Sequence, residues 1–207
     1  MICRYTLLTE GSTDAALLPI LDWTIRRHTN QVFSGEFAYR RGQGLAEKIR
    51  NALEDAPCDL LFIHRDSDRE EPFRRYEEIQ AALTEAKVEQ PSVCVVPVRM
   101  MEAWLLFDPG VLRQAAGNRN SRATLNLPTH AQLENIADPK TVLREALRTA
   151  SERRGRRLDE FNKQIPAAMR RITQLTDDFS PLLRMSAFQR LQDDVRAILE
   201  ARNWREE

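Results

Sequence analysis

The chain has 207 residues, of which 42% are hydrophobic and 30% are charged, and 31 Lys and Arg balance 31 Asp and Glu. This length suits one globular domain or a main domain with an extension, and the balanced charge excludes a uniformly basic or acidic protein. No stretch approaches the roughly 18 consecutive apolar residues that a membrane helix needs, and the first residues lack a signal-peptide pattern. We therefore expect a soluble cytoplasmic protein without membrane contact.

The three cysteines, Cys3, Cys58 and Cys94, are far apart in the sequence and lie in apolar stretches. An odd number of isolated cysteines favours neither disulfides nor a zinc site. We expect buried free thiols in a reducing compartment.

The first hundred residues alternate between strand-like and helix-like patterns. Apolar runs predict strands at 2–8, 31–40, 60–64 and 93–98. Between them, apolar residues at helical spacing predict helices at 13–27, 42–54 and 77–87. Strands that alternate with helices predict an α/β fold with a mostly parallel sheet covered by helices on both faces.

The pattern changes after Pro97, where helical spacing continues without further strands. Short helices are predicted at 101–107 and 109–116, a polar connector at 117–137, and longer helices at 139–151, 158–176 and 185–204. We therefore expect an α/β core over residues 1–108 and an all-helical extension over residues 109–207 that packs on it.

Acidic residues follow two of the predicted strands. Glu10 and Asp14 follow the first strand, and Asp66 and Asp68 follow the third; if the chain stays extended there, both aspartates face the same side. The carboxyl ends of parallel strands share the edge where ligands usually bind. Carboxylates gathered there repel one another unless a divalent cation holds them together. Glu102, within an apolar stretch, is the fifth candidate ligand.

The predicted ion is Mg²⁺ or Mn²⁺, because the candidate ligands are carboxylates and the three histidines do not form a ligand set. Four of the five carboxylates, all except Glu10, also have an ordinary structural interpretation. Asp14 suits the first turn of a helix, and the two aspartates suit a polar turn. Glu102 suits an exposed helix edge or a pair with Arg99, and His64 points either into the core or toward the site.

Charge is unevenly distributed along the chain. Residues 54–89 hold eleven acids against five bases, whereas residues 140–171 hold ten bases against four acids. An acidic centre followed by a basic arm suits a metal site beside a surface that binds a polyanion. The alternative is that the basic arm is simply the solvated face of a helix.

The motifs Thr9-Glu10-Gly11 and Asp66-Ser67-Asp68 resemble, in order and strand context, those of the TOPRIM domain of topoisomerases, primases and OLD-type nucleases. Glu10-Gly11-x-x-Asp14 is most similar to the OLD-type branch. Glu102-Ala103-Trp104-Leu105-Leu106 resembles a segment of small stand-alone TOPRIM-like bacterial proteins, which are often encoded beside an ATPase in phage-defence operons. The resemblance covers roughly residues 1–108.

This resemblance implies a two-metal nuclease that hydrolyses phosphodiester bonds, with DNA favoured over RNA. Asp66 and Asp68 would hold one metal ion, and Glu10 would complete that site or act as general base. Asp14 and Glu102 would support a second ion. The basic residues that would contact nucleic acid are Arg153, Arg154, Arg156, Arg157 and Lys163.

The resemblance further implies an ATPase partner, and it leaves a homodimer open. The alternative function is a non-catalytic TOPRIM-like module that binds a partner ATPase or nucleic acid. In that case the apolar stripe between Leu182 and Leu199 would dock the partner, although such a stripe more often packs on its own domain. A nucleotide-dependent phosphotransferase is disfavoured, because the sequence has no Gly-x-x-x-x-Gly-Lys-Ser/Thr loop.

Overall fold

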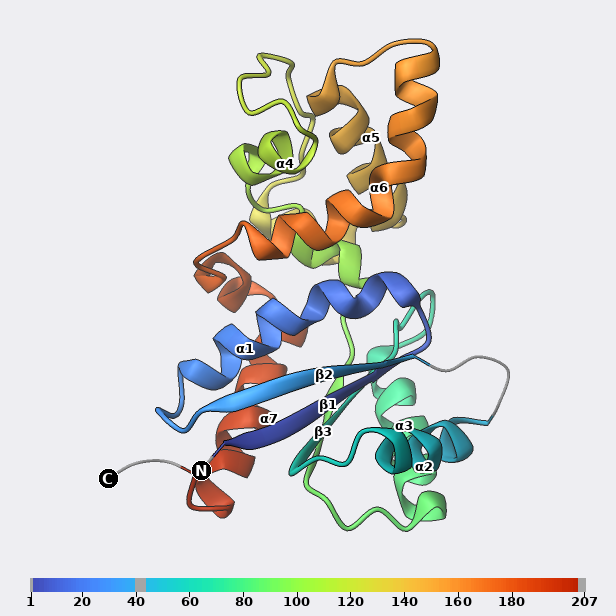
Figure 1. Ribbon diagram of the computed structural model, residues 1–207, viewed down its shortest axis with the longest axis vertical. Coiled ribbons are helices and arrows are strands. Elements are labelled where there is room, and N and C mark those ends of the chain that lie inside the picture. The colour runs from blue at the N-terminus through green and yellow to red at the C-terminus, as the bar shows by residue number, and fades with distance from the viewer. Residues whose placement is uncertain (1, 40–43, 205–207) are drawn as a thin grey trace.

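A computed structural model describes residues 2–39 and 44–204. Its centre is a four-stranded sheet in the order β2-β1-β3-β4, in which every pair of neighbours is parallel (Figure 1). The strands are β1 (Cys3–Thr9), β2 (Phe33–Tyr39), β3 (Leu60–His64) and β4 (Ser92–Val95). The predicted α/β class, with a parallel sheet flanked by helices and a helical C-terminal part, is confirmed.

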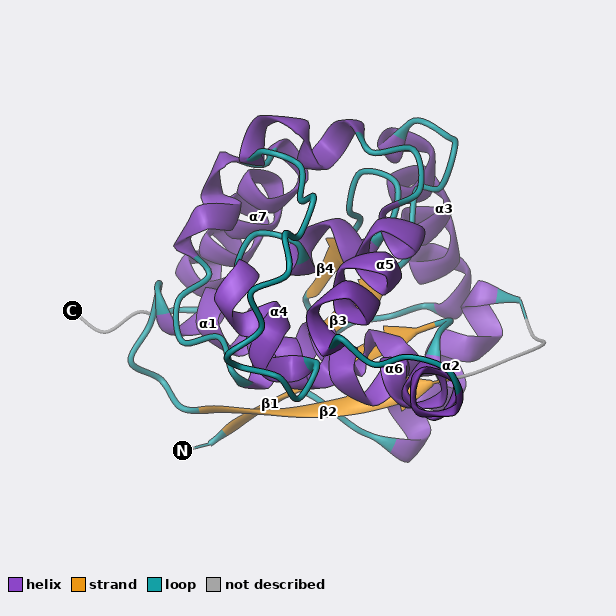
Figure 2. Ribbon diagram, turned by 90° about the horizontal axis from the view of Figure 1, so that it is seen from above, coloured by secondary structure: helices purple, strands orange, loops and turns teal. Residues whose placement is uncertain are grey.

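Helices cover both faces of the sheet (Figures 1 and 2). One face carries α1 (Leu18–Arg26) and α7 (Ser186–Ala201), and the other carries α2 (Leu45–Asp55) and α3 (Pro72–Ala86). Because side chains alternate along a strand, Leu7 and Phe62 enter the first hydrophobic layer while Leu8 and Ile63 enter the second. All five residues of β3 are buried, as expected for a central parallel strand.

The remaining helices form a second part, at the top of Figure 1, on the side of α1 that faces away from the sheet. They are α4 (Pro109–Ala115), α5 (Pro139–Ser151) and α6 (Arg156–Gln174), with the 3-10 helices η3 (His130–Asn135) and η4 (Ser180–Arg184). Helix α6 is sharply bent and contains Pro166, which cannot donate a backbone hydrogen bond within the helix. No helix in the described part of the chain is long and apolar enough to cross a membrane.

One hydrophobic cluster joins the sheet to the helical part. It includes Leu7 and Phe62 of the sheet together with Leu147 of α5, Ile165 of α6 and Phe188 of α7. The apolar stripe near the C-terminus is therefore buried against its own chain. The boundary at residue 108 stays a prediction.

Prolines explain most differences between predicted and observed element boundaries. The helix predicted at 13–27 divides into the 3-10 helix η1 (Ser12–Leu17) and α1, whose first turn contains Pro19. Helix α3 begins at Pro72, five residues before its predicted start at residue 77. Strand β4 ends before Pro97, and the helix predicted at 101–107 is the 3-10 helix η2 (Met101–Leu105). The predicted helix start at residue 42 lies outside the described residues.

Cys3, Cys58 and Cys94 are buried free thiols, as predicted. Burial raises the pKa of each thiol, in the case of Cys94 to about 11. These side chains therefore behave as small apolar groups of the core.

Candidate functional site

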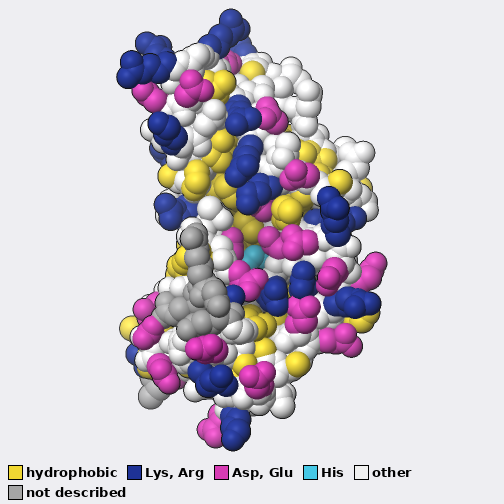
Figure 3. Space-filling view, turned by 90° about the vertical axis from the view of Figure 1, so that its right-hand side faces the viewer, with side chains coloured by type: hydrophobic (Ala, Val, Ile, Leu, Met, Phe, Trp, Pro, Cys, Tyr) yellow, Lys and Arg dark blue, Asp and Glu magenta, His cyan; other side chains and the backbone are white. Residues whose placement is uncertain are grey.

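The five carboxylates predicted from the sequence line one small pocket at the carboxyl ends of β1 and β3. The pocket has a volume of about 210 Å³. Figure 3 shows acidic side chains around a histidine in a hollow, with Lys and Arg side chains above them. The lining residues are Glu10, Gly11, Thr13, Asp14, His64, Arg65, Asp66, Asp68, Glu102 and Lys140.

Gly11 places Asp14 in the pocket. The Gly11 backbone N–H donates to Asp14 Oδ2 at 3.0 Å, and a Cβ at position 11 would lie only 2.7 Å from that oxygen. Glycine is thus needed for the close approach of Asp14. Burial, with the charge of Asp66 adding to it, raises the pKa of Asp14 despite the opposing effects of His64 and the Gly11 N–H.

His64 lies at the bottom of the pocket and is 2% exposed. Its Nδ1 donates to the Val95 carbonyl at 2.9 Å, so Nε2 faces Asp66 Oδ1 at 3.4 Å and Asp14 Oδ2 at 3.8 Å. Burial lowers the pKa of His64, but the hydrogen bond and charge of Asp66 and the charge of Asp14 outweigh it and raise the pKa to about 9. A protonated His64 offsets part of the negative charge of the two aspartates.

The loop after β3 is attached to the loop after β4. Asp66 Oδ1 accepts a hydrogen bond from the Met101 N–H at 2.9 Å, and the buried Ser67 hydroxyl donates to the Pro97 carbonyl at 3.0 Å. Asp68 has a φ of 54°, so the chain is not extended through Asp68 as the shared-side prediction requires. Instead, the Asp68 carboxylate is 3.8 Å from Arg75 of α3.

Glu102 is buried at the start of η2 and only 4% exposed. The interpretation of Glu102 as an exposed helix edge is therefore wrong. The expected pair between Glu102 and Arg99 is not formed. The Arg99 guanidinium instead donates to the Asp68 carbonyl oxygen at 3.1 Å. Burial and then the negative charge of Asp66 raise the pKa of Glu102, while the charge of Lys140 lowers it.

The Glu10 carboxylate forms close ion pairs with two cations. Lys48 Nζ of α2 lies 2.8 Å from Glu10 Oε1, and Arg65 Nη2 lies 3.3 Å from Oε2. Partial burial opposes ionisation, but these two cations lower the pKa of Glu10 overall. Glu10 thus lines the pocket while its charge is directed to Lys48 and Arg65.

The acidic side chains suit a hard divalent cation in their chemistry. Asp14, Asp66 and Glu102 face one pocket, and burial together with mutual repulsion raises the pKa of Asp14 and Glu102. A bound cation relieves this repulsion. Within residues 2–39 and 44–204, however, no three Asp, Glu, His or Cys side chains are already arranged to hold an ion. Binding would require the carboxylates to turn toward the ion.

The predicted nucleic-acid-binding residues lie around the connection between α5 and α6, at the end of the helical part farthest from the sheet (Figure 1). The Arg153 guanidinium stacks on Phe161, 4.9 Å from the ring centroid. Arg156 is exposed and forms an ion pair with Glu160 at 3.5 Å. Arg154, Arg157 and Lys163 are exposed. None of these five residues lines the acidic pocket.

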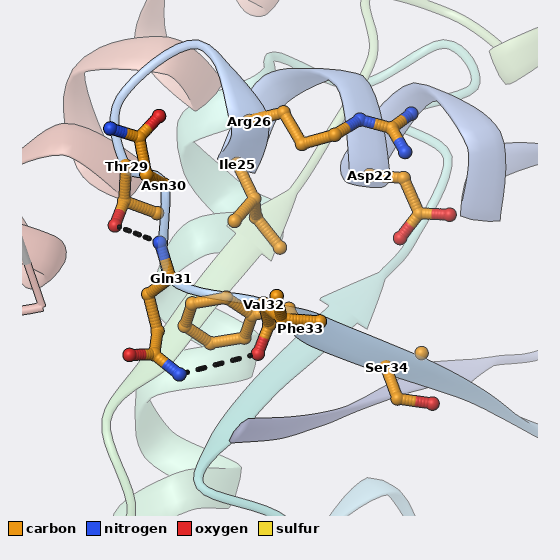
Figure 4. Close-up of a pocket in the computed structure, with 10 residues that line it drawn as sticks. Asp22, Ile25, Arg26, Thr29, Asn30, Gln31, Val32, Phe33 and Ser34 are labelled. Carbon is orange, nitrogen blue, oxygen red and sulfur yellow. Dashed lines mark hydrogen bonds between the residues drawn. The ribbon is translucent and has the colours of Figure 1, made fainter. Parts of the chain in front are cut away.

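A larger pocket of about 540 Å³ lies elsewhere, between the C-terminal end of α1 and the start of β2 (Figure 4). Its lining includes a single acid, Asp22, beside Arg26. It contains none of the five predicted carboxylates, and so the size of a pocket does not identify the candidate site here.

Sequence reasoning missed the cations that shape the site. Lys48 is a charged residue on the apolar face of a helix, three residues after Leu45 and four before Ala52, and this position signals a buried partner. Likewise, Thr13 and Lys140 line the pocket without having been predicted. Lys140 gives no local signal, because its place depends on how the helical part packs.

Comparison with known protein families gives a match over most of the chain. A family model described as "Domain of unknown function (DUF4276)" matches residues 9–170. Neither the curated proteins nor the solved structures contain a match. The matched range begins at the end of β1 and includes all five pocket carboxylates and the start of α5. The chain therefore belongs to the family described as DUF4276.

Proposed function

We propose that this chain is a divalent-metal-dependent nuclease that hydrolyses phosphodiester bonds, with DNA as the favoured polymer. The observation that carries the proposal is the meeting of five carboxylates in one small pocket whose edge is basic. Phosphoryl transfer at a metal site needs both features, since carboxylates bind the metal and cations attract the phosphate. The similarity of the Glu10-Gly11 and Asp66-Ser67-Asp68 motifs to those of TOPRIM nucleases supports the same chemistry.

Each of the five carboxylates has a role in this proposal. Asp14, Asp66 and Glu102 would hold Mg²⁺ or Mn²⁺, which polarises the phosphate and stabilises the leaving oxygen. Asp68 would contribute from the exposed rim. Glu10, kept ionised by Lys48 and Arg65, would accept a proton from the attacking water. Turned toward the ion instead, Glu10 would complete a second site.

The cellular setting is part of the proposal. The similarity to stand-alone TOPRIM-like defence proteins suggests action in the bacterial cytoplasm, in phage defence, with an ATPase partner encoded nearby. The three buried free thiols support a reducing compartment. A homodimer also fits this setting. Light scattering on the purified chain measures its oligomeric state.

The alternative function is a non-catalytic module that binds an ATPase or nucleic acid. Two observations favour it: the ion pairs of Glu10 with Lys48 and Arg65, and the lack of a ready-made ligand group among the described residues. Such a module would bind its partner without needing the carboxylates of the pocket.

Cleavage by an Asp66→Asn variant distinguishes the two functions. Asparagine keeps an oxygen that can accept from the Met101 N–H, so the loop geometry is retained while the negative charge is lost. With plasmid, single-stranded DNA and RNA, we expect cleavage in Mn²⁺ or Mg²⁺ and none in EDTA. The cleavage rate of the variant should fall at least about 100-fold. This is the upper end of the loss caused by removing a residue that supports a metal ligand.

The matched control is Asp193→Asn, which removes one carboxylate from the exposed surface of α7. This control should cleave like the unmodified chain, because exposed ion pairs contribute little to stability. Cleavage that persists in EDTA or in Asp66→Asn would contradict the proposed metal chemistry. Binding without cleavage, unchanged in Asp66→Asn, would favour the non-catalytic module.

A further inference from the structure

A second pocket adjoins the acidic one and has the opposite charge. Its volume is about 310 Å³, and it shares Thr13 and Lys140 with the acidic pocket. Among the residues that the structure describes, no acidic side chain lines it. Its lining residues are Thr13, Lys140, Arg144, Arg148, Asn162, Ile165, Pro166 and Met169. An acidic and a basic pocket therefore meet at Thr13 and Lys140.

The basic side of this pocket is a single row on α5. Lys140, Arg144 and Arg148 are four residues apart, which places them on one face of the helix at intervals of about 6 Å. The adjacent face, with Leu143 and Leu147, is buried in the hydrophobic core. The row is therefore fixed in direction by the packing of α5, and it leads away from the acidic pocket.

The members of this row differ in how they are held. Arg148 is half-buried, and its guanidinium donates to Asn162 Oδ1 at 2.8 Å and to Glu145 Oε1 at 2.5 Å. Lys140 and Arg144 are exposed, and neither forms an ion pair with another residue in the ranges 2–39 and 44–204. Two cations next to the acidic pocket thus keep their charge available for a ligand.

We infer that Lys140, Arg144 and Arg148 bind consecutive phosphates of a nucleic-acid backbone and lead the strand into the acidic pocket. This inference rests on the proposed nuclease function, because it identifies the surface that delivers the substrate. Cations spaced along a line suit a chain of phosphates, and binding of this kind is electrostatic and independent of sequence. The Asn162 amide group offers a further donor on the same path.

Substrate binding would then use a different part of the basic arm from the one expected from the sequence. Arg153 is engaged with Phe161 and Arg156 with Glu160, and both residues lie near the outer end of the helical part. The row on α5, by contrast, shares Lys140 with the acidic pocket. This row is therefore placed to hold the strand next to the carboxylates.

The test compares two double variants that remove the same charge. Lys140→Gln/Arg144→Gln removes two cations from the row, and Arg156→Gln/Arg157→Gln removes two exposed cations from the start of α6. Binding of fluorescent single- and double-stranded DNA is measured by anisotropy in EDTA, which prevents metal-dependent cleavage, over a series of salt concentrations. Circular dichroism confirms that both variants fold, as expected for exposed positions.

We expect the Lys140/Arg144 variant to bind about tenfold more weakly or worse at low salt. The slope of log affinity against log salt should fall by about one for each lost phosphate contact. The Arg156/Arg157 variant should bind like the unmodified chain. Asp66→Asn should bind at least as well, because it removes a negative charge near the strand, although it no longer cleaves.

Several outcomes would overturn the inference: no DNA binding by the unmodified chain, unchanged binding by the Lys140/Arg144 variant, or a loss confined to the Arg156/Arg157 variant. Unchanged binding together with metal-dependent cleavage that Asp66→Asn abolishes would reject the row on α5 but keep the nuclease. Binding that depends on the row without cleavage in any metal would reject the nuclease but keep the row as a nucleic-acid surface.

Discussion

At the scale of single residues, the position of the Asp14 carboxylate depends on the absence of a side chain at Gly11. In the structure, the Asp14 carboxylate occupies the space that a side chain at position 11 would need. Gly11 has an ordinary extended φ of −117°, so the constraint is space and not backbone conformation. Any side chain at position 11 must displace a proposed metal ligand.

Gly11→Ala therefore tests whether Asp14 contributes to metal binding. We expect the added methyl group to displace the Asp14 carboxylate and to weaken Mn²⁺ binding by about 10- to 100-fold, as the loss of a supporting contact does in known metal sites. The measurement is the rise in thermal unfolding midpoint on adding Mn²⁺, which should shrink in the variant.

Gly44→Ala is the matched control for this substitution. Gly44, like Gly11, precedes the first residue of a helix, but nothing lies within 4 Å of a Cβ added there. Both substitutions place alanine directly before a helix, and alanine caps helices poorly, so both variants lose some stability for this reason. If Mn²⁺ raised the thermal unfolding midpoint equally little in both variants, the role assigned to Asp14 would be contradicted.

At the scale of elements, the contact between α2 and the end of β1 decides how Glu10 behaves. The Lys48 side chain is 9% exposed and that of Glu10 is 42% exposed, so the two partners are unequally buried. Removing Glu10 leaves the charge of Lys48 buried without its close partner. Removing Lys48 leaves the Glu10 carboxylate in contact with solvent and with Arg65. The two single substitutions should therefore have unequal effects on stability.

Glu10→Ala should lower the free energy of unfolding by about 1–3 kcal/mol, because Lys48 is left buried without its close partner. Lys48→Met should cost less than about 1 kcal/mol, since methionine suits the apolar face of α2. The double variant should recover much of the stability lost in Glu10→Ala. Urea unfolding measures all three, and a larger loss in Lys48→Met than in Glu10→Ala would contradict this account of the pair.

At the scale of the whole molecule, the sequence predicted which residues gather but not how their charges are arranged. Glu10, Asp14, Asp66 and Asp68 could be placed at one edge because parallel strands end on the same side. The pairing of Glu10 with Lys48 depends on packing between residues 38 positions apart, which no local pattern records. The position of Lys140 depends on the docking of a helix more than 120 residues after Glu10.

The fold shows the same division between local and distant causes. Strands and helices were predictable because hydrophobic periodicity is local, and the shifts in their boundaries follow from Pro19, Pro72 and Pro97. The shared core of the sheet and the helical part was not predictable in detail. That packing brings a basic helix to an acidic pocket and so creates the surface to which we assign substrate binding.

The proposed nuclease depends on a divalent cation bound in the acidic pocket. Titration of Mn²⁺ into the purified chain by isothermal calorimetry, in parallel with Asp66→Asn and Asp193→Asn, measures this binding. We expect saturable binding to the unmodified chain and to Asp193→Asn, and binding at least about tenfold weaker in Asp66→Asn. No saturable binding to the unmodified chain, or equal binding in all three proteins, would contradict the claim.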